Sequence, residues 1–592
     1  MRRLILSIFV VLCCYGVASA IPAYRGWITF TQPDGTTLKL RQNGDEFCHW
    51  LTNMDGEVVE KGEDGFYHVV SESTVQARRA AARMRRTAAN AARRSSPAKA
   101  DIATGQKHFL VILVQFTDVQ FNFSSDAAAQ QAFDNLLNQQ GYSTNGGHGS
   151  ARDFYYDNSH GYFEPIFDVY GPVTLNNTQA YYGGNDSNGD DLRPHIAVQQ
   201  GCQALDGQVD FSQYDNDNDG EVDLVFMYYA GNGEADSDVE DSIWPHQWEL
   251  GPTGAKIAAS SRTWDGKAVN KYACTNEIVG YGTLKGKMCG IGTACHEFGH
   301  AMGLPDFYDT DYTTNGEAGG LYDYSTMCGG SYNDSGRRPP YFNTEERIML
   351  GWPNVEIREI VKSGTYTLTS VDNNIAYKSP TDKDGEYFLY ECRSNEGWDQ
   401  DLPEHGLIVY HVDKSNRSVN IGGTSATAQS LWDNWQTYNS INENGSHPCF
   451  YVVPAGGLTK LNYTGSQFAF PGAAKKYAFT GSSWNGVDSE VKLTSINYAS
   501  NTVTFYAEAP SVNLNYNLIE NPGNGVYTAG STFNLVLNES EAQPVTSVEW
   551  YFDDEPVSGT SVTLTAGAHV VEAHLTLTTG EVKILELILR AE

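Results

Sequence analysis

Residues 295–309 read CHEFGHAMGLPDFYD and contain two histidines four residues apart. On an α-helix this spacing places the imidazoles of His296 and His300 on one face, so both rings can reach a single metal ion. Glu297 lies on the adjacent flank, where its carboxylate can hold a metal-bound water without ligating the metal. The pattern HExxH is typical of zinc hydrolases. It predicts a zinc site that still needs a third protein ligand.

The residues after the second histidine supply the candidates for that ligand. Gly303 can end the helix because glycine adopts a left-handed conformation without steric cost, and Pro305 prevents the helix from resuming. The turn brings Asp306 back toward the ion. The spacing HExxHxxGxxD matches the metzincin pattern, with aspartate in place of the last histidine. We therefore predict Asp306 as the third ligand. The alternatives are Asp309, Asp311 and Glu317.

A methionine in a tight turn strengthens the metzincin pattern. Met327, in the stretch YDYSTMCGG, follows Asp306 as the Met-turn of a metzincin would. Some metzincins have a tyrosine two residues after this methionine, where this chain has Gly329. Tyr332 and Tyr341 are therefore the candidates for an oxyanion contact.

Together with its flanks, the site resembles the immune inhibitor A family of secreted bacterial metalloproteases. The resemblance covers roughly residues 105–505 and also rests on GLPDFYDTDY, GSARDFYYDNSHGYF, DNDNDGEVDLVFMYYAG and EYFLYECRSNEGWDQDLPEHGLIVYHVD. It implies zinc held by His296, His300 and Asp306, with Glu297 as the catalytic acid/base. It also implies broad specificity for protein and peptide substrates. A closed structural zinc site would need a fourth protein ligand, and Cys295 projects from the wrong side of the helix.

The acidic stretch DNDNDGEVD (215–223) predicts a calcium loop. Its carboxylates alternate before Gly220, as in the first half of an EF-hand loop. Phe226 stands where that loop has its bidentate glutamate, so we expect a structural calcium site of the broader DxDxDG type. The alternative is an acidic surface turn. The candidate ligands are Asp215, Asp217, Asp219, Glu221 and Asp223.

The N-terminal hundred residues predict export and latency. Residues 1–20 have a charged start, an apolar run and a small-residue cleavage site, which is typical of a secretory signal peptide. In residues 21–75, alternating apolar positions are separated by turn motifs, which predicts a few β-hairpins. Residues 76–100 are rich in arginine and alanine. We interpret residues 76–100 as an exposed activation linker, although a solvated helix is the alternative. Cys48 and His49 are the candidates for an inhibitory zinc ligand.

Composition and pattern set the remaining expectations. The net charge of −33 argues against nucleic acid and anionic lipid as partners, and no further apolar stretch has membrane-spanning length. We expect an α+β, metzincin-like protease domain with a β-rich C-terminal part, then a small all-β immunoglobulin-like sandwich. The predicted parts are signal peptide 1–20, propeptide 21–100, zinc metalloprotease domain 101–508 and sandwich 509–592.

Two functions from different classes fit these observations. The first is a secreted zinc endopeptidase, made as a zymogen, that cleaves extracellular proteins. The second is a surface adhesin or binding protein with a vestigial protease domain. The intact Glu297 favours the enzyme, whereas the C-terminal sandwich suits a contact with carbohydrate or the cell surface. A zinc amidase is compatible with HExxH alone, but the flanking stretches disfavour it.

Overall fold

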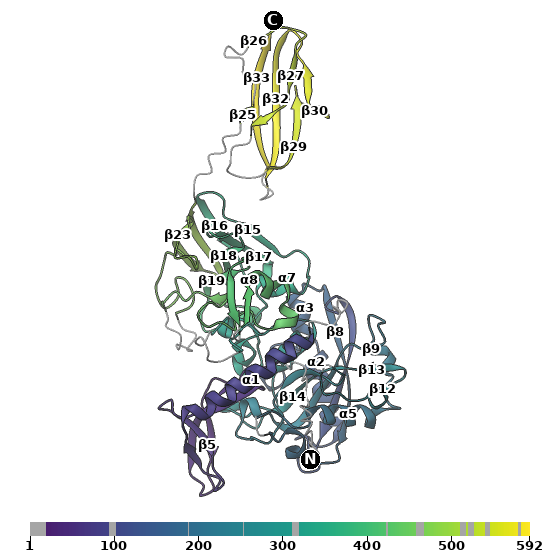
Figure 1. Cartoon of the computed structure of the whole chain (residues 1–592). Helices are drawn as coiled ribbons and strands as arrows, with labels where there is room; N and C mark the ends of the chain where they lie inside the picture. The colour runs from purple at the N-terminus through teal and green to yellow at the C-terminus, as the bar shows by residue number, and fades with distance from the viewer. Residues whose placement is uncertain are drawn as a thin grey trace, which may run out of the picture. The chain divides into compact units, whose positions relative to one another are not determined.

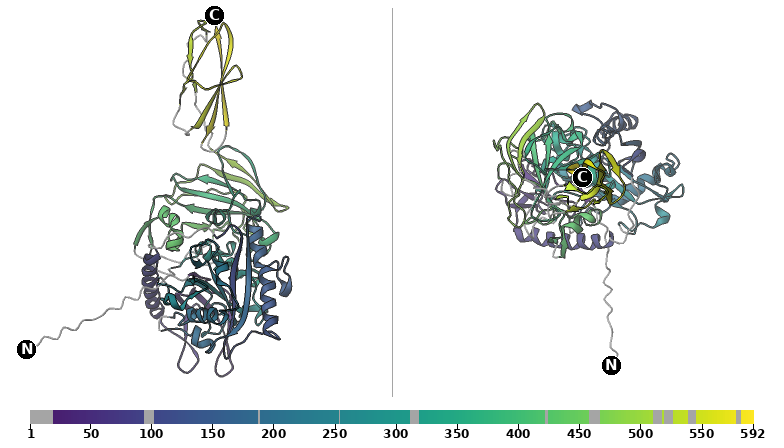
Figure 2. Two further views of the ribbon diagram at one scale, coloured as in Figure 1. Left: turned by 90° about the vertical axis from the view of Figure 1, so that its right-hand side faces the viewer. Right: turned by 90° about the horizontal axis from the view of Figure 1, so that it is seen from above.

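The computed structural model describes residues 19–93, 102–186, 189–252, 254–310, 319–421, 424–457, 467–509, 517–518, 526–538, 545–577 and 582–592 (Figure 1 and Figure 2). The chain divides into two units. The first consists of Met1–Ile357, Tyr366–Ser489 and Leu493–Phe505, and the second of Arg358–Thr365, Glu490–Lys492 and Tyr506–Glu592. The predicted mixture of helices and strands is confirmed, and the chain is rich in β-structure.

The first unit contains a six-stranded sheet in the order β1-β11-β14-β10-β7-β8. Strands β8, β7, β10 and β14 are parallel, whereas β11 pairs antiparallel with β14 and β1 antiparallel with β11. The buried strands predicted at 108–116 and 221–231 are observed as β7 and β10. The bounds are β1 (Ser19–Ala20), β7 (Gly105–Gln115), β8 (Phe163–Thr174), β10 (Val225–Asn232), β11 (His246–Glu249) and β14 (Lys271–Ile278).

Strand β7 separates two hydrophobic cores, because alternate side chains of a strand point to opposite faces. Val111 belongs to the core that also contains side chains of α2, α3 and α6. Its neighbour Ile112 belongs to the core that contains side chains of α5. The histidine pair therefore lies on a helix, α6, that is packed against the sheet. The bounds are α2 (Asp126–Asn138), α3 (Ala151–Asn158), α5 (Pro194–Leu205) and α6 (Gly292–Ala301).

The chain after residue 352 continues mainly as β-structure, as the sequence predicted. One sheet has the order β15-β17-β18-β19-β22 and a second has the order β16-β24-β23. Short helices α8 (Ala428–Asp433) and α9 (Trp435–Tyr438) precede β22. The strand bounds are β15 (Glu356–Glu359), β16 (Gly364–Leu368), β17 (Ile375–Pro380), β18 (Glu386–Arg393), β19 (Gly406–Asp413), β22 (Phe450–Val452), β23 (Lys492–Ala499) and β24 (Thr502–Glu508).

The N-terminal segment forms a meander of five antiparallel strands, which confirms the predicted hairpins. Its apolar side chains Ile28, Phe30 and Leu40 share a small core with Val279 and Tyr281. The meander therefore packs on the same unit that carries α6. The bounds are β2 (Ile28–Thr31), β3 (Thr37–Asp45), β4 (Cys48–Thr52), β5 (Val58–Lys61) and β6 (Tyr67–Val69).

The arginine-rich stretch begins as a helix, α1 (Glu72–Arg93), rather than as an exposed linker. Val75 and Ala82, at i and i+7, are buried against Trp50 of the meander. Between them Arg79 is only 9% exposed, and its guanidinium lies 3.8 Å from the centre of the Trp50 ring. The expectation of an exposed linker is therefore wrong for residues 76–82, because Ala82 and the stem of Arg79 form a packed face together with Val75. Residues 94–101 lie outside the described part, as do the side chains of residues 83–93.

The second unit contains strands and no helix among its described residues. Its main sheet has the order β26-β33-β32-β29-β30, and β27 pairs with β31. Phe533, Leu564, Val571 and Leu589 form its core. The bounds are β26 (Val526–Tyr527), β27 (Thr532–Asn534), β29 (Val545–Phe552), β30 (Glu555–Val557), β31 (Ser561–Thr563), β32 (Gly567–Leu577) and β33 (Val582–Ala591).

Two further features concern export and cross-linking. Within the described ranges no helix combines the length and apolar character that crossing a bilayer requires. None of the eight cysteines from Cys48 to Cys449 forms a disulfide bond in this structure. The predicted signal peptide falls almost entirely on residues 1–18, outside the described part.

Candidate metal centre

The predicted helix is observed as α6, and it ends where the glycine permits a reversal. Gly303 has φ +107°, a conformation that favours glycine. The backbone N–H groups of Gly303 and Leu304 donate to the carbonyls of His300 and Gly299, which completes the last turn. The chain then turns back across the end of the helix and brings Asp306 beside both histidines.

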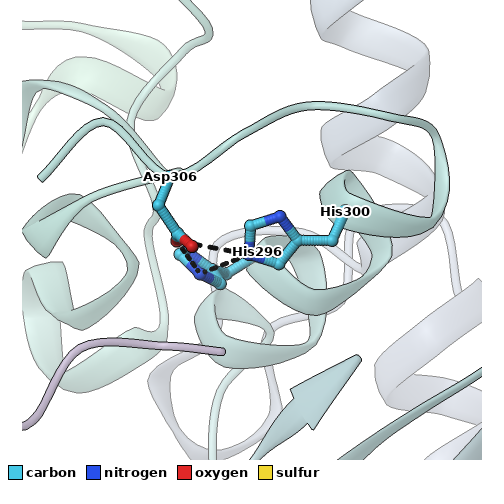
Figure 3. Close-up of side chains that lie close together, drawn as sticks. All are labelled: His296, His300 and Asp306. Carbon is cyan, nitrogen blue, oxygen red and sulfur yellow. Dashed lines mark hydrogen bonds and ion pairs between the residues drawn. The ribbon is translucent and has the colours of Figure 1, made fainter. Parts of the chain in front are cut away.

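Three buried side chains converge at this turn (Figure 3). The Nε2 atoms of His296 and His300 lie 3.0 Å apart. Asp306 Oδ1 lies 3.2 Å from Nε2 of His296 and 3.3 Å from Nε2 of His300. For a tetrahedral ion with bonds of 2.0–2.1 Å, geometry requires ligand atoms about 3.3 Å apart. The spacing of the three atoms therefore fits zinc.

The hydrogen bonds of the two rings also fit a metal. Nδ1 of His296 lies 2.8 Å from the carbonyl oxygen of Thr326, and Nδ1 of His300 lies 2.8 Å from that of Leu304. Because a carbonyl only accepts, each Nδ1 carries a proton, and each ring in its neutral form presents an Nε2 lone pair. Asp306 Oδ1 is buried without a hydrogen-bond donor. The three inward-facing atoms are therefore acceptors, which is a set that a cation satisfies.

The electrostatics of the site separate its two carboxyl groups. Burial raises the pKa of Glu297 well above its usual range, and the nearby Asp306 carboxylate adds to this rise. Burial also opposes ionisation of Asp306, but charge and hydrogen bonds from the His300 and His296 rings, when these are protonated, outweigh it and hold the pKa of Asp306 below its usual range. Burial lowers the pKa of His296, which favours the neutral, metal-ligating form of the ring. The two carboxyl groups of the site are therefore held in different electrostatic environments.

The other candidate ligands do not join this group. Asp309 is buried, but its carboxylate is not among the converging atoms. Asp311 and Glu317 lie outside the described residues. Cys295 is buried in the hydrophobic core on the sheet side of α6, where burial raises the pKa of its thiol.

Met327 packs against the helix that carries the histidine pair. A side chain added at Gly299, between the two histidines, would collide with the Met327 sulfur. Met327 is fully buried, and its carbonyl accepts from the N–H of Phe307, next to Asp306. The methionine turn therefore supports both the helix and the ligand loop.

Of the two tyrosines considered for an oxyanion contact, Tyr332 is the one at the site. Its hydroxyl donates to the carbonyl oxygen of Pro22 at 2.8 Å, and the Glu297 carboxylate contributes to the rise in the pKa of Tyr332, mainly caused by burial. Tyr341 packs elsewhere, where its backbone N–H donates to Asp399.

The N-terminal segment crosses the candidate site. Ser19 and Ala20 pair antiparallel with β11 as an additional edge strand. The N–H of Ile21 then donates to Glu297 Oε1 at 2.8 Å, and Trp244 Nε1 donates to the carbonyl of Ile21 at 3.0 Å. Ile21 is 1% exposed. A stretch of extended chain thus occupies the surface beside Glu297 as a bound peptide would.

Neither residue that the sequence suggested for latency makes this contact. Cys48 is buried in the core that the meander forms with α1. His49 Nε2 lies 3.2 Å from Glu234 Oε1, and its ring stacks on Trp244. The contact with Glu297 comes from a backbone N–H, and hydrophobic patterning cannot reveal such a group.

The acidic loop is partly assembled. Carboxylate oxygens of Asp215, Asp217 and Asp219 lie within 4.8 Å of one another. Glu221 and Asp223 are not in that cluster, and Asp223 instead accepts from the N–H and side-chain amide of Asn216. Lys267 Nζ lies 2.5 Å from Asp215 Oδ2. Burial opposes ionisation of Asp215, but Lys267 and backbone donors hold its pKa below the usual range. A cation and Lys267 would therefore compete for this carboxylate.

Comparison with known proteins identifies the domain that carries the site. Residues 100–348 match the family described as "Immune inhibitor A peptidase M6, catalytic domain". The residues that carry the candidate metal centre are therefore similar to a peptidase catalytic domain. Over these residues the chain is similar to the immune inhibitor A family, the family that the sequence motifs resemble.

Two curated relatives show how far this likeness extends. Immune inhibitor A of Bacillus thuringiensis subsp. alesti is 26% identical over 308 residues, 44% of this chain and 43% of the relative. Pre-pro-metalloprotease PrtV of Vibrio cholerae serotype O1 is 28% identical over 240 residues, 37% of this chain and 25% of the relative. The chain thus matches less than half the length of either relative. A crystal structure of OgpA from Akkermansia muciniphila aligns over 83% of this chain and 95% of that chain with 10% identity. The TM-score of 0.19 is too low to indicate a common fold.

Proposed function

We propose that this protein is a secreted, zinc-dependent endopeptidase, made as a zymogen, that hydrolyses peptide bonds of extracellular proteins. The observation that carries the proposal is the convergence of two Nε2 lone pairs and one carboxylate oxygen beside a second, unligated carboxyl group. His296, His300 and Asp306 would hold the ion, and Glu297 is the second carboxyl group. This arrangement leaves one coordination position for water, as catalytic zinc sites do and structural ones do not.

The chemistry follows from what these side chains can do. Zinc held by these residues would lower the pKa of a bound water to about 7 and would polarise a carbonyl group. Glu297, whose pKa is raised by burial, accepts the proton of the attacking water and passes it to the leaving amine. Tyr332 donates to a peptide carbonyl beside Glu297 in this structure, which supports an oxyanion contact in the reaction. We place the Met-turn of a metzincin at Met327.

Latency is the second part of the proposal. Residues 21–100 would form the propeptide, and Ile21 to Tyr24 would occupy the position of substrate. The N–H of Ile21 occupies one oxygen of the Glu297 carboxylate, so the bound segment would compete with the attacking water for this group. Cleavage of the predicted signal peptide after Ala20 would make this nitrogen a free amino group at the same place.

A structural calcium ion at Asp215, Asp217 and Asp219 is a third part. Support comes from the clustering of three carboxylates before Gly220, which has φ +94°. Calcium would have to displace Lys267 from Asp215. We extend the proposed ligand set to Glu221 and Asp223 only if the loop rearranges on binding.

The remaining parts of the proposal concern boundaries and partners. We propose a signal peptide at 1–20, a catalytic domain at 101–508 and an immunoglobulin-like sandwich at 509–592. The sandwich suits contact with carbohydrate or the cell surface, and the substrates are exposed proteins or peptides. We propose no role in binding nucleic acid, because the net charge is −33.

The direct test uses the processed protein and a mixture of denatured proteins. New N-termini should appear during incubation, vanish when a zinc chelator is added, and return when zinc is restored. The rival function, an adhesin with a vestigial protease domain, predicts no new termini under any condition. Cleavage that persists in excess chelator would contradict the zinc mechanism.

A further inference from the structure

The predicted ligand Asp306 is held by an asparagine far away in the sequence. The side-chain amide of Asn439 donates through Nδ2 to Asp306 Oδ2 at 2.8 Å. Its Oδ1 accepts from the backbone N–H of Asp306 at 2.6 Å. One side chain therefore grips both the carboxylate and the backbone of the same residue.

This pair of hydrogen bonds decides which oxygen faces the histidines. With Oδ2 bound to Asn439, Oδ1 is the oxygen 3.2 Å and 3.3 Å from the two Nε2 atoms. Figure 3 shows the Asp306 carboxylate directed at both rings. The second bond fixes the backbone from which the carboxylate extends. Partners that orient a ligating carboxylate in this way raise the affinity of the site for its metal.

Asn439 is itself fixed in the required position. It is 2% exposed and follows α9 with φ 47°, a left-handed conformation that asparagine adopts more readily than most residues. Its N–H donates to the carbonyl of Trp435, and its carbonyl accepts from Thr310 Oγ1. The orientation of the amide therefore comes from a fixed backbone.

Neighbours of Asn439 grip the same loop without touching a predicted ligand. Trp435 Nε1 donates to the carbonyl of Gly303 at 2.9 Å. Asn442 Nδ2 donates to the carbonyl of Phe307 at 2.8 Å. The turn from α6 to Asp306 is thus anchored along its length by residues 435–442.

We propose that Asn439 is a positioning residue for the metal, which it serves by fixing Asp306 with Oδ1 toward the ion. The inference rests on the proposed role of Asp306 as a ligand. It implies that the metal centre is completed by a segment beyond residues 100–348, the part that matches the peptidase family. Residues 100–348 alone would therefore bind zinc more weakly than the full chain.

The test compares zinc affinity among full-length variants that keep the backbone conformation. Asn439→Gly removes the amide but tolerates φ 47°, and Asn439→Asp keeps the shape but turns a carboxylate oxygen toward Asp306. The matched control is Asn442→Ala, which removes a buried amide from the same segment and from the same loop. Competition with a chelator gives the free zinc concentration at half occupancy, and melting temperatures report folding.

Both Asn439 variants should need about 10- to 100-fold more free zinc for half occupancy. At saturating zinc, Asn439→Gly should keep the wild-type KM. Asn442→Ala should lower the melting temperature and should change zinc affinity much less than either Asn439 variant, because Asn442 contacts the loop but not the Asp306 carboxylate. Wild-type zinc affinity in Asn439→Gly, or an equal loss in Asn442→Ala, would overturn the inference. Asp306→Ala separates the two claims, because full zinc binding in that variant would overturn the ligand assignment in the proposed function, and this inference with it.

Discussion

Replacing Tyr24 with alanine should raise the residual peptidase activity of the uncut protein. The Tyr24 ring stacks on Tyr281 with ring centres 3.6 Å apart and meets Tyr332 edge-on at 5.4 Å. An aromatic pair contributes about 1 kcal/mol beyond its buried area. Burial of a half-covered ring adds a further contribution of about 1 kcal/mol. A loss of about 2 kcal/mol would raise the fraction of molecules with an open site about 30-fold, because 1.4 kcal/mol is a factor of ten.

The assay measures hydrolysis of a quenched fluorescent peptide by uncut protein, whose intact N-terminal segment is verified by mass. Trp27→Ala is the matched control, because Trp27 is partly exposed and its ring contacts Arg41 within the meander. Tyr24→Ala should show about 30-fold more residual activity, and Trp27→Ala should stay at the wild-type level. After processing, all three proteins should have equal kcat/KM. If uncut Tyr24→Ala hydrolysed the peptide no faster than uncut wild type, or if uncut Trp27→Ala hydrolysed it equally fast, the substrate-like mode of latency would be refuted.

Three further predictions concern other parts of the chain. Asp217→Ala should reduce the gain in melting temperature on adding calcium, because a ligand that binds only the native state stabilises that state. An unchanged gain would show that the loop is an acidic surface turn and not a calcium site. Processing should spare Arg78-Arg79, since Arg78 pairs with Glu60 and Arg79 is buried on Trp50, so N-terminal sequencing should find no start at 79 or 80. Burial raises the pKa of Asp236 to about 7 from 3.8. Its contribution to stability is therefore present below pH 3.8 and is lost as the pH rises through about 7. Asp236→Asn should gain melting temperature relative to wild type between pH 5 and pH 8, and a constant difference would contradict this assignment.

The parts of the site that the sequence predicted are those determined by local geometry. The i, i+4 spacing of His296 and His300 fixes a helix face, and Gly303 fixes the turn that returns Asp306 to it. Buried strands such as β7 were also predictable, because a continuous apolar run is what a strand between two cores requires. The family match at 100–348 agrees with this local pattern.

The parts that escaped prediction depend on contacts between distant segments. Asn439 lies 133 residues from Asp306, and nothing in its local sequence distinguishes it from other turn asparagines. The contact of Ile21 with Glu297 uses a backbone N–H across 276 residues. The sequence predicted the first part of α1 to be exposed, because the face that packs consists only of Val75, Ala82 and the stem of Arg79 and gives no clear apolar pattern. In each case a polar or small residue gains its role from a partner that periodicity cannot identify.

The central claim is that Glu297 moves the proton while three other side chains hold zinc. One measurement tests this claim most directly: zinc content and peptide hydrolysis determined on the same preparation of processed Glu297→Gln. The substitution keeps size and polarity but removes the proton acceptor, so we predict one zinc ion per chain and hydrolysis reduced about 100-fold or more. Hydrolysis near the wild-type rate with zinc bound would contradict the account.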